Sequence, residues 1–166
     1  MKVNFTEHLE SGMEVLRTRG AFLTVKSGDK INTMTIGWGS VGYNWNRPIF
    51  TVLVRKSRYT YDLIENSDNF TVSIPLSGNL KSALAVCGSK SGRDTDKFKE
   101  CNLTLEKSKK VETPIIAECE LHYECKILYK QAMNCEFLSK DIVESAYKEG
   151  DYHTLYYGEI VETYIK

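Results

Sequence analysis

A basic, hydroxyl-rich segment at residues 55–60 (Arg-Lys-Ser-Arg-Tyr-Thr) lies where a predicted strand passes into a predicted helix. A phosphate monoester carries nearly two negative charges and three acceptor oxygens. It is bound well by cations, hydroxyls and the N–H groups of a helix N-terminus. The segment therefore predicts a phosphate site, built from Arg55, Lys56, Ser57, Arg58 and Thr60. The residues alone also allow a basic helix start with Ser57 as its cap.

A second polar segment, residues 32–40, follows the strand-like pattern of a hairpin. Asn32, Thr33 and Thr35 stand where apolar residues would otherwise alternate. Backbone N–H groups and short hydroxyls there could meet the polar edge of an isoalloxazine ring, and Trp38 could cover part of its face. The alternative is an exposed hairpin strand whose tryptophan packs into the core.

A glycine pattern at residues 37–42 matches the dinucleotide-binding sequence G-x-G-x-x-G. That motif requires a strand before it and a helix opening inside it, so that the helix N-terminus holds pyrophosphate. Residues 43–48 (Tyr-Asn-Trp-Asn-Arg-Pro) are typical of a turn and not of a helix. A doubly wound nucleotide-binding domain is therefore not expected.

The predicted elements are mostly strands with short helices between them. Alternation and β-branched residues predict strands at 21–25, 31–38, 49–54, 70–74, 116–129, 142–145 and 152–161. Helical spacing predicts helices at 5–16, 59–64, 80–86 and 95–101, the last capped by Asp94. This order favours a mainly β, antiparallel barrel with flanking helices over a parallel α/β sheet.

The composition predicts a single domain over residues 1–166 with one core. There are 22 basic and 22 acidic residues, which gives no electrostatic reason to expect nucleic acid or a membrane as partner. No apolar run approaches the roughly 20 residues that span a bilayer, and no signal segment is evident. We therefore expect a cytoplasmic protein. Its five cysteines form no CxxC pair, so we expect buried free thiols and no metal site.

Four segments resemble, in order, the signatures of the flavin reductase-like, FMN-binding split-barrel family, which includes flavoredoxin-like proteins. They are residues 32–38, 55–64, 91–98 and 153–161. The resemblance covers most of the chain from Gly20 to Val161. It implies a Greek-key split β-barrel, non-covalently bound FMN and a homodimer with FMN near the interface. One departure is Gly37, where family members commonly have serine.

The resemblance also implies roles for individual residues. The isoalloxazine would be lined by Asn32, Thr33, Met34 and Thr35, with Trp38 close by. The ribityl phosphate side would be bound by Arg55, Ser57, Arg58 and Thr60. A third segment would approach the flavin through Ser89, Ser91, Gly92 and Lys97. His153 would lie on the side of the nicotinamide or the acceptor, although it could equally be a surface residue.

The implied activity is an NAD(P)H-dependent oxidoreductase that passes electrons through FMN to a second small-molecule acceptor. FMN carries the chemistry itself, which agrees with the absence of a Ser–His–Asp order or a G-x-S-x-G elbow. The alternatives are a non-enzymatic flavin or haem binder that carries electrons, and an interaction module with a vestigial pocket. The sequence does not distinguish NADH from NADPH or identify the acceptor.

Overall fold

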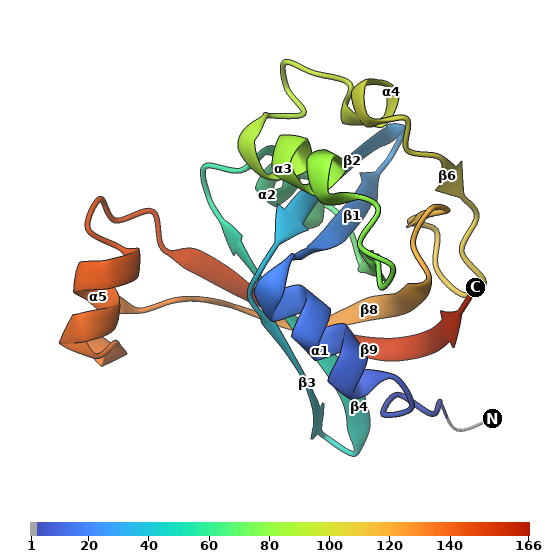
Figure 1. Cartoon of the computed structure of the whole chain (residues 1–166). Coiled ribbons are helices and arrows are strands. Elements are labelled where there is room, and N and C mark those ends of the chain that lie inside the picture. Colours follow the sequence, from blue (N-terminus) through green and yellow to red (C-terminus); the bar gives the residue numbers. More distant parts are fainter. Residues whose placement is uncertain (1–2) are drawn as a thin grey trace.

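One antiparallel sheet of seven strands organises the molecule (Figure 1). The computed structural model describes residues 3–166. The strands are β1 (Ala21–Ser27), β2 (Lys30–Ile36), β3 (Gly39–Asn44), β4 (Arg47–Arg55), β5 (Asn69–Ile74), β8 (Leu121–Ala132) and β9 (His153–Ile165). Their order is β2-β1-β5-β8-β9-β4-β3, and every described pairing is antiparallel. The prediction of a mainly β, antiparallel fold is confirmed.

The two ends of this sheet are consecutive in the chain. β2 and β3 are joined by Gly37 and Trp38, yet within residues 3–166 no ladder pairs them. The sheet therefore stays open between them. A second, two-stranded sheet is formed by β6 (Leu105–Glu106) and β7 (Ile115–Ile116).

Short helices lie between the strands of the described chain. They are α1 (Leu9–Thr18), α2 (Tyr59–Ile64), α3 (Lys81–Ser89), α4 (Lys97–Cys101) and α5 (Lys140–Ala146), with a 3₁₀ turn at Cys135–Phe137. The first three of these helices pack on the sheet. Figure 1 shows α2, α3 and α4 gathered beside β1 and β2, whereas α5 stands off at the far end of β8 and β9. Within the described range, no helix has the length and apolar character needed to cross a bilayer.

Two buried hydrophobic clusters lie one on each face of β1, and all of Ala21–Val25 is buried. The larger cluster packs Phe50, Tyr123 and Tyr156 with the apolar side of α1. The smaller places Phe22 against α3 and Cys119. Cys87, Cys119 and Cys125 are buried free thiols, as expected; Cys101 is half-buried and Cys135 is exposed.

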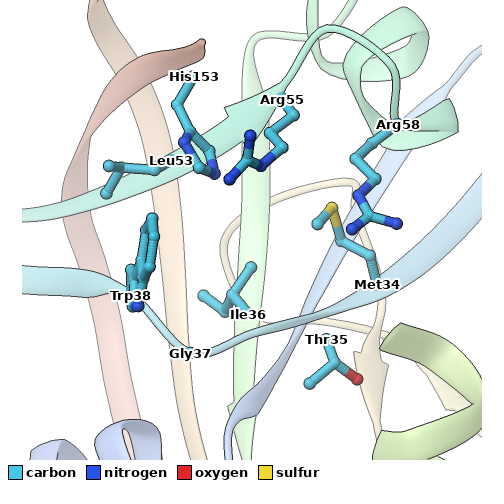
Figure 2. A pocket seen from close by; sticks show the side chains of 9 residues that line it. All are labelled: Met34, Thr35, Ile36, Gly37, Trp38, Leu53, Arg55, Arg58 and His153. Carbon is cyan, nitrogen blue, oxygen red and sulfur yellow. The ribbon is translucent and has the colours of Figure 1, made fainter. Parts of the chain in front are cut away.

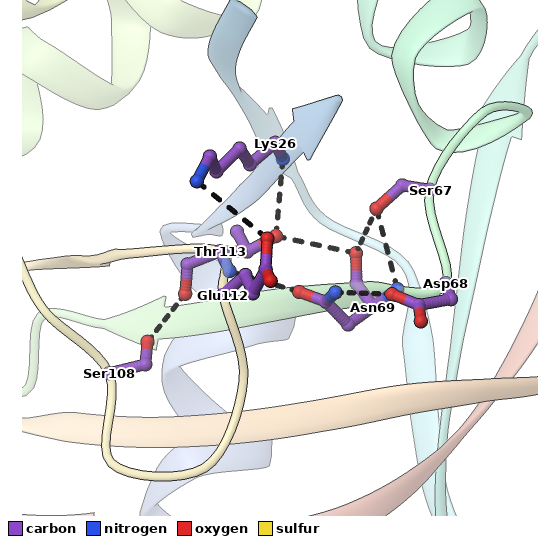
Figure 3. A network of polar contacts seen from close by, with 7 residues as sticks. All are labelled: Lys26, Ser67, Asp68, Asn69, Ser108, Glu112 and Thr113. Carbon is purple, nitrogen blue, oxygen red and sulfur yellow. Dashed lines mark hydrogen bonds and ion pairs between the residues drawn. The ribbon is translucent and has the colours of Figure 1, made fainter. Parts of the chain in front are cut away.

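A polar network fastens the loop before β7 to the sheet (Figure 3). The Thr113 N–H donates to Oδ1 of Asn69 at 3.0 Å, and its hydroxyl accepts from the Lys26 N–H at 3.1 Å. Ser108 donates to the Thr113 carbonyl, and the Lys26 ammonium pairs with Glu112 at 3.8 Å. These bonds satisfy the buried polar groups of Ser108 and Thr113, in a loop that has no ladder of its own.

The structure corrects five sequence predictions. The strand predicted at residues 116–129 is divided, because residues 117–120 form a turn between β7 and β8. Residues 142–145 are helical, within α5, and not a strand. Residues 39–44 form β3, which was not predicted, although this strand agrees with the exclusion of a dinucleotide-binding helix. The first helix begins at Leu9 and not at residue 5. Asp96, not Asp94, caps α4 by accepting from the Lys99 N–H at 3.2 Å.

Candidate functional site

A hollow of about 200 Å³ opens where β2 turns toward β3. We call it the Trp38 hollow (Figure 2). It is lined by Met34, Thr35, Ile36, Gly37, Trp38, Leu53, Arg55, Arg58 and His153. Figure 2 shows an apolar side formed by Ile36, Leu53 and Trp38, and a cationic side formed by Arg55 and Arg58. This combination suits a flat, largely apolar ligand with polar edges.

A second hollow, of about 120 Å³, adjoins the first and shares Met34 and Arg58 with it. We call it the Lys97 hollow. It is lined by Asn32, Met34, Ser57, Arg58, Tyr59, Thr60, Cys87, Gly88, Ser89, Lys90, Ser91, Gly92, Arg93 and Lys97. Hydroxyls and cations predominate in this set, as they do in sites for phosphate. Together the two hollows form one groove with an apolar end and a cationic end.

Lys97 is a buried cation at the base of the second hollow, with 4% of its surface exposed. Its ammonium donates to the carbonyls of Thr33 at 2.9 Å and Cys87 at 3.0 Å. None of the ion pairs among residues 3–166 involves it. Burial lowers the pKa of this ammonium, because a charge without a counter-ion is costly away from water. An anion in the hollow would supply that counter-ion.

Arg58 lies at the junction of the two hollows. Across the described chain no carboxylate pairs with its guanidinium. Its neighbour Arg93 differs, because it pairs with Asp62 at 2.6 Å and lies over the Tyr59 ring. Arg58, unlike Arg93, therefore has no carboxylate partner within residues 3–166 to neutralise its charge beside the groove.

Arg55 and Ser57 direct their donors at the loop before β9. Arg55 donates to the carbonyls of Asp151 at 3.0 Å and Ala146 at 2.9 Å. The Ser57 hydroxyl and N–H both donate to the Asp151 carboxylate, at 2.6 and 3.2 Å. The two residues still border the groove, but the bonds they make here tie the end of β4 to residues 146–151.

His153 is nearly buried and points into the Trp38 hollow (Figure 2). Its Nδ1 is bonded to the Tyr147 hydroxyl at 2.7 Å, and its ring lies 5.4 Å from that of Trp38. Burial, followed by the charge of Arg55, lowers the pKa of His153 to about 4. The imidazole is therefore neutral at physiological pH, with Asp151 opposing the shift only in part.

Close packing joins the first predicted segment to the second, to the third and to α3. The Asn32 amide donates to the Thr60 hydroxyl at 2.9 Å, and both are buried. A Cβ on Gly92 would stand 2.0 Å from Oδ1 of Asn32, so only glycine lets the third segment approach β2 this closely. The Thr35 hydroxyl donates to the Leu84 carbonyl at 2.6 Å and thereby links β2 to α3.

Most of the predicted site residues come together at the groove. Those that line it are Asn32, Met34, Thr35, Trp38, Arg55, Ser57, Arg58, Thr60, Ser89, Ser91, Gly92, Lys97 and His153. Thr33 and Lys56 line neither hollow. The Thr33 hydroxyl is buried and bonded to Thr24 and the Leu23 carbonyl, and Lys56 is exposed to solvent.

Sequence reasoning missed several residues that shape the site. Ile36 and Leu53 complete the apolar side of the Trp38 hollow. Strand alternation could have indicated both. Tyr147 and Asp151 reach the site from a loop, and no local pattern marks them. No three His, Cys, Asp or Glu side chains gather as metal ligands anywhere in residues 3–166.

The model of the flavin reductase-like domain family matches residues 13–166 of this chain. The chain belongs to the flavin reductase-like domain family. An uncharacterized protein of Archaeoglobus fulgidus is 32% identical over 149 residues, which are 90% of this chain and 73% of that protein. The family assignment confirms the resemblance drawn from the four ordered segments.

Two solved structures place this flavin reductase-like chain in the expected fold. The flavoredoxin of Methanosarcina acetivorans is 28% identical, with a TM-score of 0.68, covering 89% of this chain and 68% of that one. A protein with a split barrel domain from Shewanella frigidimarina has a TM-score of 0.69 at 16% identity, covering 98% of this chain and 76% of that one. The second likeness concerns the fold alone.

Proposed function

We propose that this protein binds FMN non-covalently in the groove and passes electrons through it from NADH or NADPH to a second, small acceptor. The observation that carries the proposal is the composition of the groove. One end is apolar and flanked by Trp38, and the other holds the buried Lys97 ammonium. A flavin mononucleotide has the matching parts, a flat ring and a phosphate, at its two ends. The likeness to a protein named flavoredoxin supports a flavin as the ligand.

In this proposal the ring lies in the Trp38 hollow and the phosphate in the Lys97 hollow. Arg58 and Lys97 supply positive charge, and Ser89 and Ser91 stand beside them. Ile36 and Leu53 keep water from the ring, while Trp38, half-exposed at the rim, leaves a side open to a transient partner. FMN supplies the redox chemistry when bound, so the chain needs no acid–base pair of its own.

Two further parts of the proposal concern the setting of the protein. A homodimer is supported by the family resemblance and by exposed aromatic side chains on one side of the sheet, Trp45 and Tyr129. A cytoplasmic location is supported by five free cysteines, which suit a reducing compartment.

An absorption spectrum tests this function directly. The purified protein is titrated with FMN without oxygen and then with NADH or NADPH. We expect saturable FMN binding and bleaching of the flavin band by at least one nicotinamide. Binding without bleaching would contradict the NAD(P)H step and favour a flavin carrier reduced by another protein. No binding at micromolar FMN would refute the cofactor assignment.

A further inference from the structure

Tyr147 and His153 form a buried pair beside the groove, and nothing in the proposed function requires it. Tyr147 is 3% exposed and His153 is 9% exposed. The Tyr147 hydroxyl lies 2.7 Å from Nδ1 of His153, with the rings 5.6 Å apart and nearly perpendicular. The other nitrogen, Nε2, forms no hydrogen bond with any residue of the range 3–166, although the ring lines the Trp38 hollow.

Tyr147 is held in place by a sharp turn at residues 150–151 and by contacts from Arg55 and Ser57. Residues 150 and 151 both have positive φ, +73° at Gly150 and +53° at Asp151, which fold the loop back sharply. Arg55 lies 5.0 Å from the centre of the Tyr147 ring and donates to carbonyls on both sides of it. Ser57 holds the Asp151 carboxylate. The motif residues Arg55 and Ser57 thus serve to fix this turn.

The hydrogen between the two side chains belongs to the phenol. Tyr147 has no second hydrogen-bond partner among residues 3–166, so its own hydrogen would be left unpaired if Nδ1 carried one instead. Arg55, the group stacked on the phenol ring, can only donate. Nδ1 is therefore the acceptor, and the neutral imidazole carries its hydrogen on Nε2.

We propose that Tyr147 is a positioning residue that fixes His153 with its Nε2–H directed into the Trp38 hollow, as a neutral hydrogen-bond donor. This rests on the proposed function, because the recipient is a planar redox ligand. The hollow then recognises a carbonyl oxygen or a ring nitrogen at the ligand's edge. Two ligands carry that chemistry, the flavin itself and the second acceptor, and the experiment distinguishes them.

The first readout needs no flavin. Histidine ring nitrogens are observed by ¹⁵N NMR in the flavin-free protein, which has only three histidines, and a His153→Asn variant assigns the signal. We expect Nε2 to be protonated and Nδ1 to show an accepted hydrogen bond, which Tyr147→Phe removes. Tyr152→Phe is the matched control, because its ring stacks on Tyr147 and does not bond His153. A hydrogen on Nδ1, or an Nδ1 signal unchanged in Tyr147→Phe, would overturn the proposal.

The second readout is ligand recognition. Losing a correctly aimed neutral donor costs about two- to tenfold in affinity. If the flavin accepts the bond, Tyr147→Phe raises the FMN dissociation constant by that factor. If the acceptor does, its KM rises while FMN affinity is unchanged. In a His153→Asn background the Tyr147→Phe change should add nothing. Full additivity, or no change in either constant, would overturn the donor role even if FMN binds.

Discussion

Lys97 gives the groove its character because its charge is buried and its hydrogen bonds go to neutral carbonyls. Two carbonyl oxygens leave one of the three ammonium hydrogens for a ligand. Lys99, two residues along the same helix, has 88% of its side chain exposed and pairs with Asp96 instead. The charge of Lys97 is therefore available to a ligand in the groove, whereas the charge of Lys99 lies on the surface.

We predict that Lys97→Met weakens FMN binding far more than riboflavin binding. A charge-assisted hydrogen bond contributes about 1.5–3 kcal/mol, so the FMN dissociation constant should rise about ten- to a hundredfold. Riboflavin lacks the phosphate and should lose little. Fluorescence quenching measures both, and Lys99→Met is the control. Equal losses for FMN and riboflavin would contradict a phosphate at Lys97.

His122 is a fully buried histidine that serves the fold. Its Nδ1 is bonded to the Ser73 hydroxyl at 3.1 Å and its Nε2 to the Cys119 carbonyl at 3.0 Å. Burial lowers the pKa of His122 to about 4. In the folded chain His122 therefore stays neutral down to about pH 4, whereas in the unfolded chain the same imidazole takes up a proton near pH 6.5.

Stability should consequently fall in mild acid. The folded pKa lies below the unfolded one, so the contribution of His122 is complete above about pH 6.5 and is lost as the pH falls toward 4. The shift corresponds to about 3 kcal/mol at most. Urea unfolding at about pH 7 and about pH 4.5 measures it. His122→Gln should reduce the dependence and leave the part that comes from His153, whose pKa burial also lowers to about 4, whereas His8→Gln should leave it unchanged; the same slope in all three proteins would contradict this origin.

At the scale of elements, the close packing of β9 depends on one glycine. A Cβ on Gly158 would stand 2.6 Å from the Phe70 ring and 2.7 Å from Cβ of Cys125. Neither neighbour can retreat easily, since both are buried in the core. The strand thus passes closely over its neighbours only at a residue without a side chain.

We predict that Gly158→Ala lowers the free energy of unfolding by about 1–3 kcal/mol, the usual cost of overpacking a core. Gly42→Ala is the control, because the same Cβ on the exposed strand β3 would meet nothing within 4 Å. That change should stay within about 0.5 kcal/mol. Urea denaturation compares them, and equal stabilities would refute the steric argument.

The elements that sequence reasoning missed lack a local signal. β3 alternates no apolar side chains, and it exists because it pairs with β4 along its whole length. Residues 142–145 carry the β-branched pair Ile-Val, yet they form α5. Intrinsic strand preference is weak, and here the Ala146 carbonyl at the end of the helix is held by Arg55, from another element.

The polar alternation before and within β8 predicts one continuous strand, but Glu118 and Glu120 lie in the turn between β7 and β8, and only Glu124 lies in β8. Glu118, Glu120 and Glu124 each accept backbone N–H groups from a different loop, at Thr104, at Leu76 and Ser77, and at Lys109 and Lys110. Glu124 is completely buried as a result. Such partners lie 14 to 44 residues away in the chain, so no local pattern identifies them.

At the scale of the whole molecule, the order of the motifs was the most informative sequence feature. Segments around residues 32, 55, 91 and 153 lie far apart in the chain, yet β2, β4, the end of α3 and β9 bring them to one groove. The resemblance indicated this assembly. The hydrogen bonds from Arg55 and Ser57 to residues 146–151 could not be predicted. They depend on where the chain after α5 comes back to the end of β4, which no local pattern shows.

The proposed homodimer makes a prediction about a surface aromatic cluster. Trp45, 58% exposed, lies 6.1 Å from the Tyr129 ring and 6.0 Å from the Tyr157 ring. If this cluster is part of the subunit interface, Trp45→Ser should weaken association of the 19.0 kDa chains. Sedimentation velocity measures the mass. Tyr43→Ser is the control, because Tyr43 is 54% exposed and stacks on Phe5 instead. A wild-type monomer would refute the dimer.

The buried ammonium at the base of the groove has a consequence for the amount of folded protein in a cell. In the proposed function, FMN binds the native chain and not the unfolded one. Free FMN therefore stabilises the folded state by mass action, by about 2.7 kcal/mol when its concentration is a hundred times its dissociation constant. Lys97 increases this coupling, because the ligand neutralises a charge that the empty fold must bear alone. The quantity of folded enzyme in a cell would then follow the availability of its cofactor, and chains made during flavin starvation would be the first to be degraded.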